Sequence, residues 1–298
     1  MPSYFGMVNT NRSQDYTPLA VSSFFARTDF DRSRGDRFFL VDNERTLSAE
    51  LKEFPRELEL IENASARSFA ENVNQILKLA INDRADLVFL NNDIVFTENW
   101  LSPLRRRRDS ITIPVCNQNE LYGTDGFQLK AQMDLGDYIG HEAELAKIVR
   151  LRLHGLGDSK RYTSPPFLPF YCFRLPLEVS KEVGLFDESF GIGGGEDIDY
   201  RIRAHLLGFQ VELAKESYLL HFMGKSTWRG GETEVETHAR NQAYTRKFIE
   251  KYGLEMAKIF LSPDHALDQL EKLELLEEWS AENYRSVIEH CISLDKSR

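Results

Sequence analysis

Two acidic residues follow a run of glycines and could do chemistry at the start of a helix. Glu196 and Asp197 come directly after three consecutive glycines (193–195), and the residues behind them predict a helix that ends at Gly208. The positive end of a helix dipole favours the ionised form of a carboxylate, which leaves a metal ligand or a proton acceptor ready at neutral pH. The ordinary alternative is that acidic residues in a first turn only cap the helix.

The glycine cluster does not have the pattern of a phosphate-binding loop. Its spacing, with Gly191 followed by glycines at 193–195, departs from GxGxxG. The two acids behind it would repel a phosphate at the helix start. The glycines would instead allow backbone and ligand to approach each other closely.

Asp93 and His221 are the candidate metal ligands. Asp93 stands at the end of an apolar run and follows Asn91 and Asn92. A carboxylate with amide neighbours can bind a hard cation such as Mg²⁺ or Mn²⁺. His221 ends a second predicted strand, and an imidazole would shift the preference towards Mn²⁺. A lone histidine at a strand end is also commonly structural.

A sheet must position these residues. Short apolar runs alternate with helical patterns over the first 115 residues, which predicts an α/β fold. Because the runs show little alternation, we expect a mainly parallel sheet covered by helices on both faces. Thr17-Pro18 and Thr97 are predicted helix starts, and Ser68 with Glu71 has the pattern of a capping box. The expected strands cover residues 4–8, 38–41, 58–61, 87–90 and 111–115.

The second half of the chain is less regular. We expect helices over 147–156 and 176–183 and strands over 209–213 and 218–221. From His238 to the end the pattern is helical. The sequence thus predicts one catalytic domain over residues 1–237 and a C-terminal helical extension over 238–298.

Polar residues follow four consecutive predicted strands. The carboxyl ends of parallel strands lie at one edge of a sheet, so these side chains should converge on one crevice. Asn and Asp are also good turn residues, which is the ordinary explanation for any single position. The residues are Asn9, Thr10, Asn11 and Arg12, then Asp42 and Asn43, then Asn63, then Asn91, Asn92 and Asp93.

Composition excludes several classes. The 298 residues carry 37 basic and 47 acidic side chains, a net charge of −10, which disfavours a nucleic-acid binder and attachment to anionic lipid by charge alone. Three scattered cysteines without a CxxC pair indicate neither a zinc knuckle nor a disulfide framework. With no signal-peptide pattern and no long apolar run, the expected location is the cytoplasm. Arg105–Arg108 reads as a solvated helix end, with attraction to anionic lipid or a lipid-diphosphate acceptor at the inner face of the membrane as the alternative.

The motifs above, in their order and spacing, resemble glycosyltransferase family 2, whose fold is GT-A. The resemblance covers residues 4–227 and includes the helix that begins at Ser68, which looks like the donor-binding helix of the family. It departs from the family at Asn91, which replaces the first acid of a DxD motif, and at Ser68 and Ile76, which replace glycines.

The resemblance implies a role for each matching residue. Asp197 would be the catalytic base, Glu196 would position the acceptor, and Asp93 and His221 would bind the metal. The expected donor contacts are Thr10, Asn11, Asp42, Asn74, Asn91, Asn92, Lys225 and Ser226, with Asp42 at the nucleotide base.

The implied activity is a metal-dependent, inverting transfer of a sugar. A nucleotide-sugar, UDP- or dTDP-linked, would be the co-substrate, with Mn²⁺ or Mg²⁺, and the acceptor a hydroxyl of a growing glycan or lipid-linked sugar. Residues 117–165 would shape the acceptor site. Two alternatives stay open: a nucleotide-sugar binding protein without transfer activity, which Asn91 favours, and a sugar nucleotidyltransferase, which would need a basic glycine-rich loop after the first strand.

Three tryptophans and the C-terminal leucines complete the expectations. Trp228 stands on a polar, glycine-rich segment and could stack on a sugar, whereas Trp100 and Trp279 should be core residues. The C-terminal helices, with Leu270, Leu273, Leu275 and Leu276, could pack on the domain or form a homodimer contact.

Overall fold

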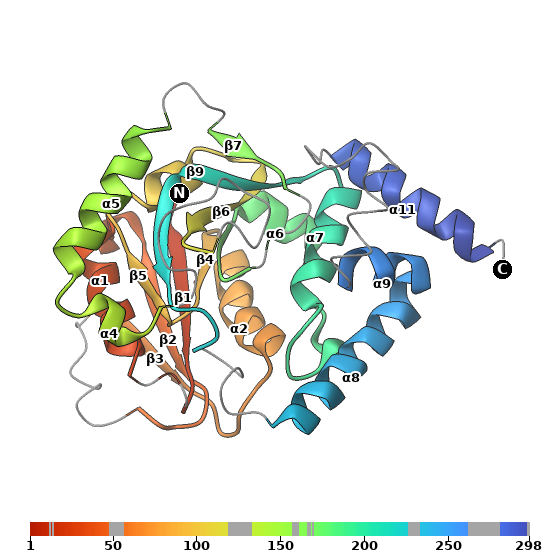
Figure 1. Ribbon diagram of the computed structural model, residues 1–298, viewed down its shortest axis with the longest axis horizontal. Coiled ribbons are helices and arrows are strands. Elements are labelled where there is room, and N and C mark those ends of the chain that lie inside the picture. The colour runs from red at the N-terminus through yellow and green to blue at the C-terminus, as the bar shows by residue number, and fades with distance from the viewer. Residues whose placement is uncertain are drawn as a thin grey trace.

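One mixed β-sheet of nine strands organises the protein (Figure 1). The computed structural model describes residues 1–11, 13, 15–47, 57–118, 133–156, 161–165, 168, 170–225, 233–261 and 281–296. The strand order is β3-β2-β1-β4-β8-β6-β9-β5, and β7 pairs with β9. The strands are β1 Ser3–Asn9, β2 Arg37–Asp42, β3 Leu58–Glu62, β4 Asp86–Leu90, β5 Ile94–Phe96, β6 Ser110–Cys116, β7 Tyr162–Thr163, β8 Cys172–Leu175 and β9 Gln210–His221.

The first four strands form the expected parallel half of the sheet. β3, β2, β1 and β4 run parallel in that order, and β4 is buried along its whole length. Strands buried on both faces need apolar side chains throughout, which explains runs such as Phe38–Val41. The carboxyl ends of these strands therefore lie at one edge, as predicted.

The second half mixes directions. β8 runs antiparallel to both β4 and β6, and β9 is parallel to β6 but antiparallel to β5 and β7. The two strands expected between 209 and 221 are one strand of 12 residues, with a register shift opposite Pro114 and Val115 of β6. β5 was missed, because three residues are too few to show a pattern.

Helices cover both faces of the sheet, as expected. Figure 1 places α1, α4 and α5 on one side and α2, α6 and α7 on the other. The helices of this region are α1 Thr17–Arg27, α2 Phe69–Asn82, α3 Leu101–Arg105, α4 Leu135–Tyr138, α5 Glu142–His154, α6 Leu177–Val183 and α7 Glu196–Leu206, with short 3₁₀ turns η1 Arg32–Arg34 and η4 Glu188–Phe190.

Two of the three predicted helix starts are confirmed, and the one at Thr97 is wrong. At α2, the Glu71 N–H donates to Ser68 Oγ (3.2 Å) and the Ser68 N–H donates to Glu71 Oε2 (2.8 Å), which completes the capping box. α1 begins at Thr17 with Pro18 in its first turn, as predicted, but the Thr17 hydroxyl does not cap the helix and donates to Asn9 Oδ1 (2.7 Å). Thr97 does not cap α3, because its hydroxyl donates to the Tyr218 carbonyl (2.6 Å) of the neighbouring strand.

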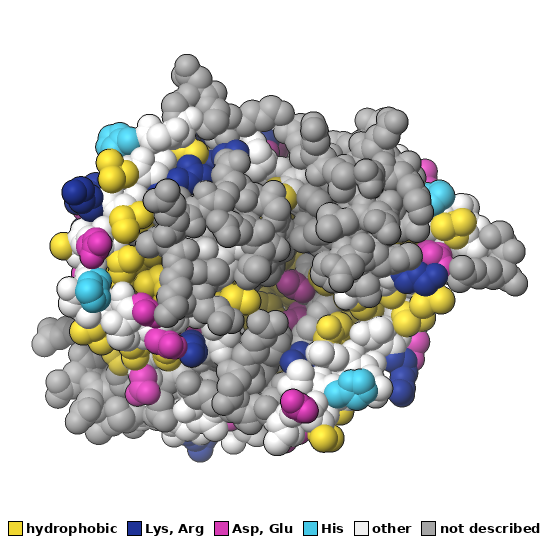
Figure 2. Space-filling model, viewed as in Figure 1, with side chains coloured by type: hydrophobic (Ala, Val, Ile, Leu, Met, Phe, Trp, Pro, Cys, Tyr) yellow, Lys and Arg dark blue, Asp and Glu magenta, His cyan; other side chains and the backbone are white. Residues whose placement is uncertain are grey.

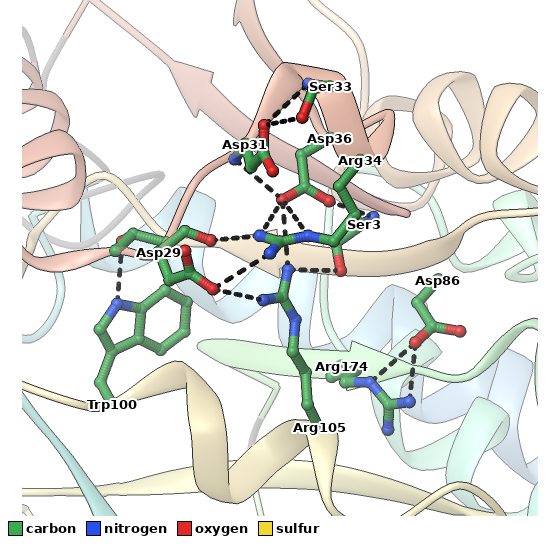
Figure 3. A network of polar contacts seen from close by, with 11 residues as sticks. Ser3, Asp29, Asp31, Ser33, Arg34, Asp36, Asp86, Trp100, Arg105 and Arg174 are labelled. Atoms are coloured by element: carbon green, nitrogen blue, oxygen red, sulfur yellow. Dashed lines mark hydrogen bonds and ion pairs between the residues drawn. The ribbon is translucent and has the colours of Figure 1, made fainter. Parts of the chain in front are cut away.

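The arginine run belongs to the amino-terminal edge of the sheet. Arg105 reaches Asp36 Oδ2 (3.4 Å) and Ser3 Oγ (3.0 Å) at the starts of β1 and β2, and Figure 3 shows this network beside Arg174. Arg106 and Arg107 pair with Glu216 and Glu212. Three of the four positive charges are therefore paired within the protein. No helix in the described ranges is long and apolar enough to cross a membrane.

The C-terminal helices pack beside α7 (Figure 1). They are α8 Glu234–Tyr252, α9 Leu254–Leu261 and α11 Ala281–Lys296, so the helical extension starts four residues before His238. α11 contacts α7, α8 contacts η4, and α9 lies against both α8 and α11. Phe248 and Tyr284 are fully buried in a second apolar core that also contains Phe190 and Ile202. Trp100 is buried as expected. Trp228, Trp279, Arg12, Ser226 and the leucines at 270–276 lie outside the described residues.

Candidate active site

Amide side chains at the carboxyl edge of the sheet bind one another. Asn63 Nδ2 donates to Asn43 Oδ1 (2.8 Å) and to Asn72 Oδ1 (2.9 Å), and Asn43 Nδ2 donates to the Arg67 carbonyl (3.1 Å). These contacts tie the ends of β2 and β3 to the start of α2. The predicted convergence at the strand ends is thus confirmed, but much of the hydrogen-bonding capacity is used inside the protein.

The loop after β1 is fixed in the same way. Asn92 Nδ2 donates to Ser13 Oγ (2.5 Å) and Thr17 Oγ1 (2.8 Å), and the Thr10 N–H donates to Ser13 Oγ (3.0 Å). Asn92 is fully buried, and its Oδ1 has no hydrogen-bond partner within the described structure. The exposed Asn11 is held through its backbone N–H by Glu44 Oε2 (2.8 Å).

Two expected donor contacts have structural partners instead. Asp42 accepts from the N–H groups of Thr46 (3.0 Å) and Leu47 (3.1 Å) and is 2 % exposed, so its carboxylate holds the turn after β2. Asn74 donates to the Phe186 carbonyl (2.9 Å) and to Glu188 Oε1 (2.8 Å) and accepts from the Phe186 N–H (2.9 Å). Asn74 is 1 % exposed, so we assign it a clamp between α2 and the 186–188 loop in place of the donor contact.

Asp93 and His221 lie side by side, as the sequence predicted for a metal pair. His221 Nε2 is 3.3 Å from Asp93 Oδ1, and both side chains are buried where β5 pairs with the end of β9. Burial alone would lower the pKa of His221, but the Asp93 carboxylate outweighs it and raises the pKa to about 10. Burial opposes ionisation of Asp93, but His221 and the Lys225 N–H, 2.9 Å from Oδ2, hold its pKa below the usual value.

The pair fits a divalent cation. Asp93 Oδ1 and His221 Nε2 are each other's close partners, so a cation bound between them would displace the proton of His221. Adjacent ligands of a small octahedral cation lie about 3 Å apart, close to the observed separation. No group of three or more His, Cys, Asp or Glu side chains suited to a metal occurs in the part of the chain that is described. A cation here would thus take its remaining ligands from phosphate and water, as Mg²⁺ commonly does.

Glu196 and Asp197 form the second acidic group. Gly195 caps α7 with φ +85°, a conformation that favours glycine, and the acids begin the helix. Glu196 Oε2 accepts from the Gly194 N–H (2.5 Å), and Asp197 Oδ1 accepts from the Ile198 N–H (2.8 Å). Burial and the adjacent Asp197 raise the pKa of Glu196 to about 7, and burial also raises the pKa of Asp197.

Phe170 and Tyr171 connect the two acidic groups. The backbone N–H of Phe170 donates to the Asp197 carboxylate. The Tyr171 ring stacks on His221 with centroids 4.8 Å apart, and its carbonyl accepts from the Asn91 N–H (2.8 Å). The candidate base and the candidate metal ligand therefore border one site, and Figure 2 shows acidic side chains in a hollow near the middle of this face.

A small pocket adjoins this site at the ends of β1 and β4. It is a shallow cavity of about 20 Å³. Its lining is apolar and amide, with no charged side chain. The lining residues are Val8, Phe69, Asn72, Phe89, Leu90, Asn91 and Asn92.

Sequence reasoning missed the aromatic residues of the site. Phe170 and Tyr171 precede β8 in a segment without a recognisable pattern, and Tyr244 belongs to α8 in the C-terminal extension. Tyr244 packs against Gly194, where an added Cβ would lie 2.5 Å from Tyr244 Cδ1. The glycines thus admit an aromatic ring of the protein itself. Lys225, which was expected to contact the donor, has its Nζ 2.8 Å from Asp134 Oδ1.

Comparison with solved structures identifies the fold. The crystal structure of GalNAc-T7 with UDP, GalNAc and Mn²⁺ aligns with 99 % of this chain at a TM-score of 0.59 and 17 % identity. The chain has the GT-A glycosyltransferase fold. It spans 57 % of the GalNAc-T7 chain.

Other comparisons add no argument. A crystal structure of S. aureus TarS, residues 1–349, aligns over 99 % of this chain and 92 % of its own, at a TM-score of 0.47 and 14 % identity. No protein-family model matches the sequence, and no curated protein matches it significantly. The match to GalNAc-T7 confirms the GT-A fold that was expected from the resemblance.

Proposed function

We propose that this protein transfers a sugar from a nucleotide-diphosphate donor to an acceptor hydroxyl, with inversion at the anomeric carbon. The observation that carries the proposal is the bridge made by Phe170 and Tyr171. It joins a buried acid–imidazole pair suited to a cation with a buried acid pair whose pKa values are raised. The donor-side pair and the acceptor-side pair would then be held next to each other by two consecutive residues of the chain.

On the acceptor side, Asp197 is the proposed base. A base works best when its pKa lies near the working pH, and burial moves the pKa of Asp197 upwards in that direction. The N–H groups of Phe170 and Ile198 hold the carboxylate in place so that it can take the acceptor proton. Glu196 would accept a hydrogen bond from, or donate one to, a neighbouring acceptor hydroxyl.

On the donor side, Asp93 and His221 would hold Mn²⁺ or Mg²⁺. When bound, such an ion neutralises charge on the departing nucleoside diphosphate. The backbone N–H of Lys225 donates to Asp93 Oδ2 and helps to hold the carboxylate, while the Lys225 ammonium pairs with Asp134. The apolar and amide pocket next to Asn91 offers neutral contacts to the donor.

The structural neighbour supports this proposal in outline. GalNAc-T7 was crystallised with UDP, GalNAc and Mn²⁺, so its GT-A fold holds a uridine nucleotide and a divalent metal. We extend a UDP-linked donor, with a dTDP-linked donor as second choice, to this chain. A glycan or lipid-linked sugar is the proposed acceptor.

A donor-turnover screen tests the proposal. The purified protein is incubated with UDP- and dTDP-sugars, with Mn²⁺, with Mg²⁺ or with a chelator, and release of the nucleotide is measured. We expect release from at least one donor and its loss with the chelator. Tight nucleotide binding without turnover would favour the nucleotide-sugar binding protein instead. Release of pyrophosphate from a nucleoside triphosphate and a sugar phosphate would favour the nucleotidyltransferase.

A further inference from the structure

The C-terminal extension borders the acidic end of α7. The Tyr244 ring lies directly over the backbone of Gly194, and a Cβ on Gly195 would lie 3.6 Å from Tyr244 Cδ2. Gly194 donates to Glu196, and Gly195 caps the helix that Glu196 and Asp197 begin. The Tyr244 ring therefore contacts the residues that directly precede Glu196 and Asp197, although Tyr244 lies almost 50 positions further along the chain.

α8 presents this ring from a fixed position. Thr233 and Glu236 form a capping box at its start. Near its end, Phe248 is fully buried, the Tyr252 hydroxyl donates to Asp199 Oδ1 (2.6 Å), and Lys251 Nζ lies 2.7 Å from Asp187 Oδ2. The C-terminal end of α8 is thereby fixed to Asp187 and to α7, and Tyr244 lies about two turns before these contacts.

The exposed face of α8 agrees with a role in binding. Arg240 and Tyr244 are four positions apart and so lie on one face of the helix. The Arg240 cation faces the Glu196 carboxylate and favours its ionised form. Tyr244 is only partly buried, unlike Phe248 one turn later. A partly exposed aromatic ring beside a base is a common way to orient a ligand that has an apolar face and polar edges.

We infer that Tyr244 is the stacking platform for the acceptor, and that the acceptor is therefore a sugar ring whose hydroxyl is directed to Asp197. This inference rests on the proposed function. Gly194 and Gly195 have no Cβ, so the Tyr244 ring can pack directly against their backbone. Arg240 is a positioning residue, because it acts on Glu196.

Binding of simple sugars tests the inference separately from transfer. Saturation-transfer NMR would be recorded with the full chain, UDP and Mg²⁺, using methyl glucoside, methyl galactoside and methyl N-acetylglucosaminide as probes. We expect binding by the wild type, a loss of about tenfold in affinity in Tyr244→Ala, and retention in Tyr244→Phe, because stacking uses the ring. Phe209→Ala, which removes another partly buried ring beyond the opposite end of α7, is the matched control and should bind like the wild type.

A double-mutant cycle sharpens the test. Gly194→Ala should weaken sugar binding for two reasons, because the added Cβ meets the ring and because φ +120° at this position strains any residue other than glycine. Adding Tyr244→Ala removes the clash but not the strain, so the double change should cost less than the sum of the two single changes. Equal sugar binding in wild type and Tyr244→Ala, or no binding of any probe by the wild type, would overturn the inference. UDP affinity is measured beside it. Intact UDP binding with no donor turnover would instead count against the proposed function.

Discussion

The site contains two acidic groups that the chain treats in opposite ways. Asp93 is paired with one imidazole, and its pKa is held below the usual value. Glu196 and Asp197 have each other as neighbours and make no ion pair with any residue the structure describes, and both pKa values are raised. Burial raises the pKa of all three carboxylates. At Asp93 the paired His221 outweighs burial, whereas no ion pair does so at Glu196 and Asp197 among the described residues.

The difference separates two kinds of chemistry. A carboxylate that binds a metal must be ionised at the working pH, since a proton competes with the cation. A base must take a proton and lose it again, which requires a pKa near the working pH. The Asp93 side is therefore suited to a cation and the Asp197 side to proton transfer. The predictions below test this division.

Replacing the proposed base should have the largest effect. Asp197→Asn keeps the size of the side chain but cannot accept the acceptor proton. We expect transfer to fall by about 10²–10⁴-fold, the range typical of a lost general base. UDP affinity, measured by calorimetry, should stay within about twofold, because the donor side is untouched.

A matched control separates chemistry from charge. Glu178→Gln removes one exposed acid from α6, outside the site, and should transfer at the wild-type rate. Transfer by Asp197→Asn at more than a tenth of the wild-type rate would show that Asp197 is not the base. It would also contradict the assignment of proton transfer to the Asp197 side of the site.

Replacing the metal ligand should have the next largest effect. Asp93→Ala removes the anion of the pair, and we expect the affinity for Mn²⁺ in the presence of UDP to fall by about 10–100-fold. Electron paramagnetic resonance of free Mn²⁺ measures it directly. Asp134→Ala, which removes an exposed acid beside Lys225, is the matched control. Equal loss in both variants would mean that general negative charge, and not ligation, holds the ion.

Replacing Asn74 tests whether this amide stabilises the fold or binds the donor. Asn74→Ala breaks three hydrogen bonds and leaves the buried Phe186 carbonyl and N–H without partners. We expect the free energy of unfolding to fall by about 2 kcal/mol in urea titrations, with unchanged UDP affinity. A clear loss of UDP affinity at wild-type stability would restore the donor contact expected from the sequence.

Local patterns predicted much of the fold. Apolar runs located β1 to β4 and β6, and Ser68 with Glu71 located the start of α2, because each signal lies within a few neighbouring residues. β5 is too short to carry a signal, and the continuity of β9 depends on its pairing with β6 across a register shift. Strand direction in the second half depends on such long-range pairing, which no local pattern contains.

The site was predicted by residue type better than by residue role. Asp93, His221 and the acids at the start of α7 were found, because each stands next to an apolar run or a glycine run that marks the boundary of an element. The amides were harder to interpret. A buried amide must satisfy its own donors, and Asn74 and Asn92 do so with partners far along the chain. Tyr171 and Tyr244 carried no motif, since their place beside the acids arises only from tertiary packing.

The smallest expected effect concerns pH and measures the acid pair itself. Glu196 has a pKa of about 7 in the folded protein, above its usual value of 4.5, so at higher pH its charge opposes ionisation of Asp197. Glu196→Gln removes that charge, and the acid limb of the transfer profile should move to lower pH by about one unit. The overall rate should also fall modestly, because Glu196 contacts the acceptor.

Stability gives the same pair a second readout. A raised pKa means that the folded state holds the proton more tightly than the unfolded state. The stability that protonated Glu196 contributes is therefore complete below about pH 4.5 and is lost as the pH rises through about 7. Glu196→Gln lacks this loss, so between pH 5 and pH 8 its melting temperature should fall less than that of the wild type. An equal fall in melting temperature in the two proteins would mean that Glu196 does not have a raised pKa and does not act on Asp197.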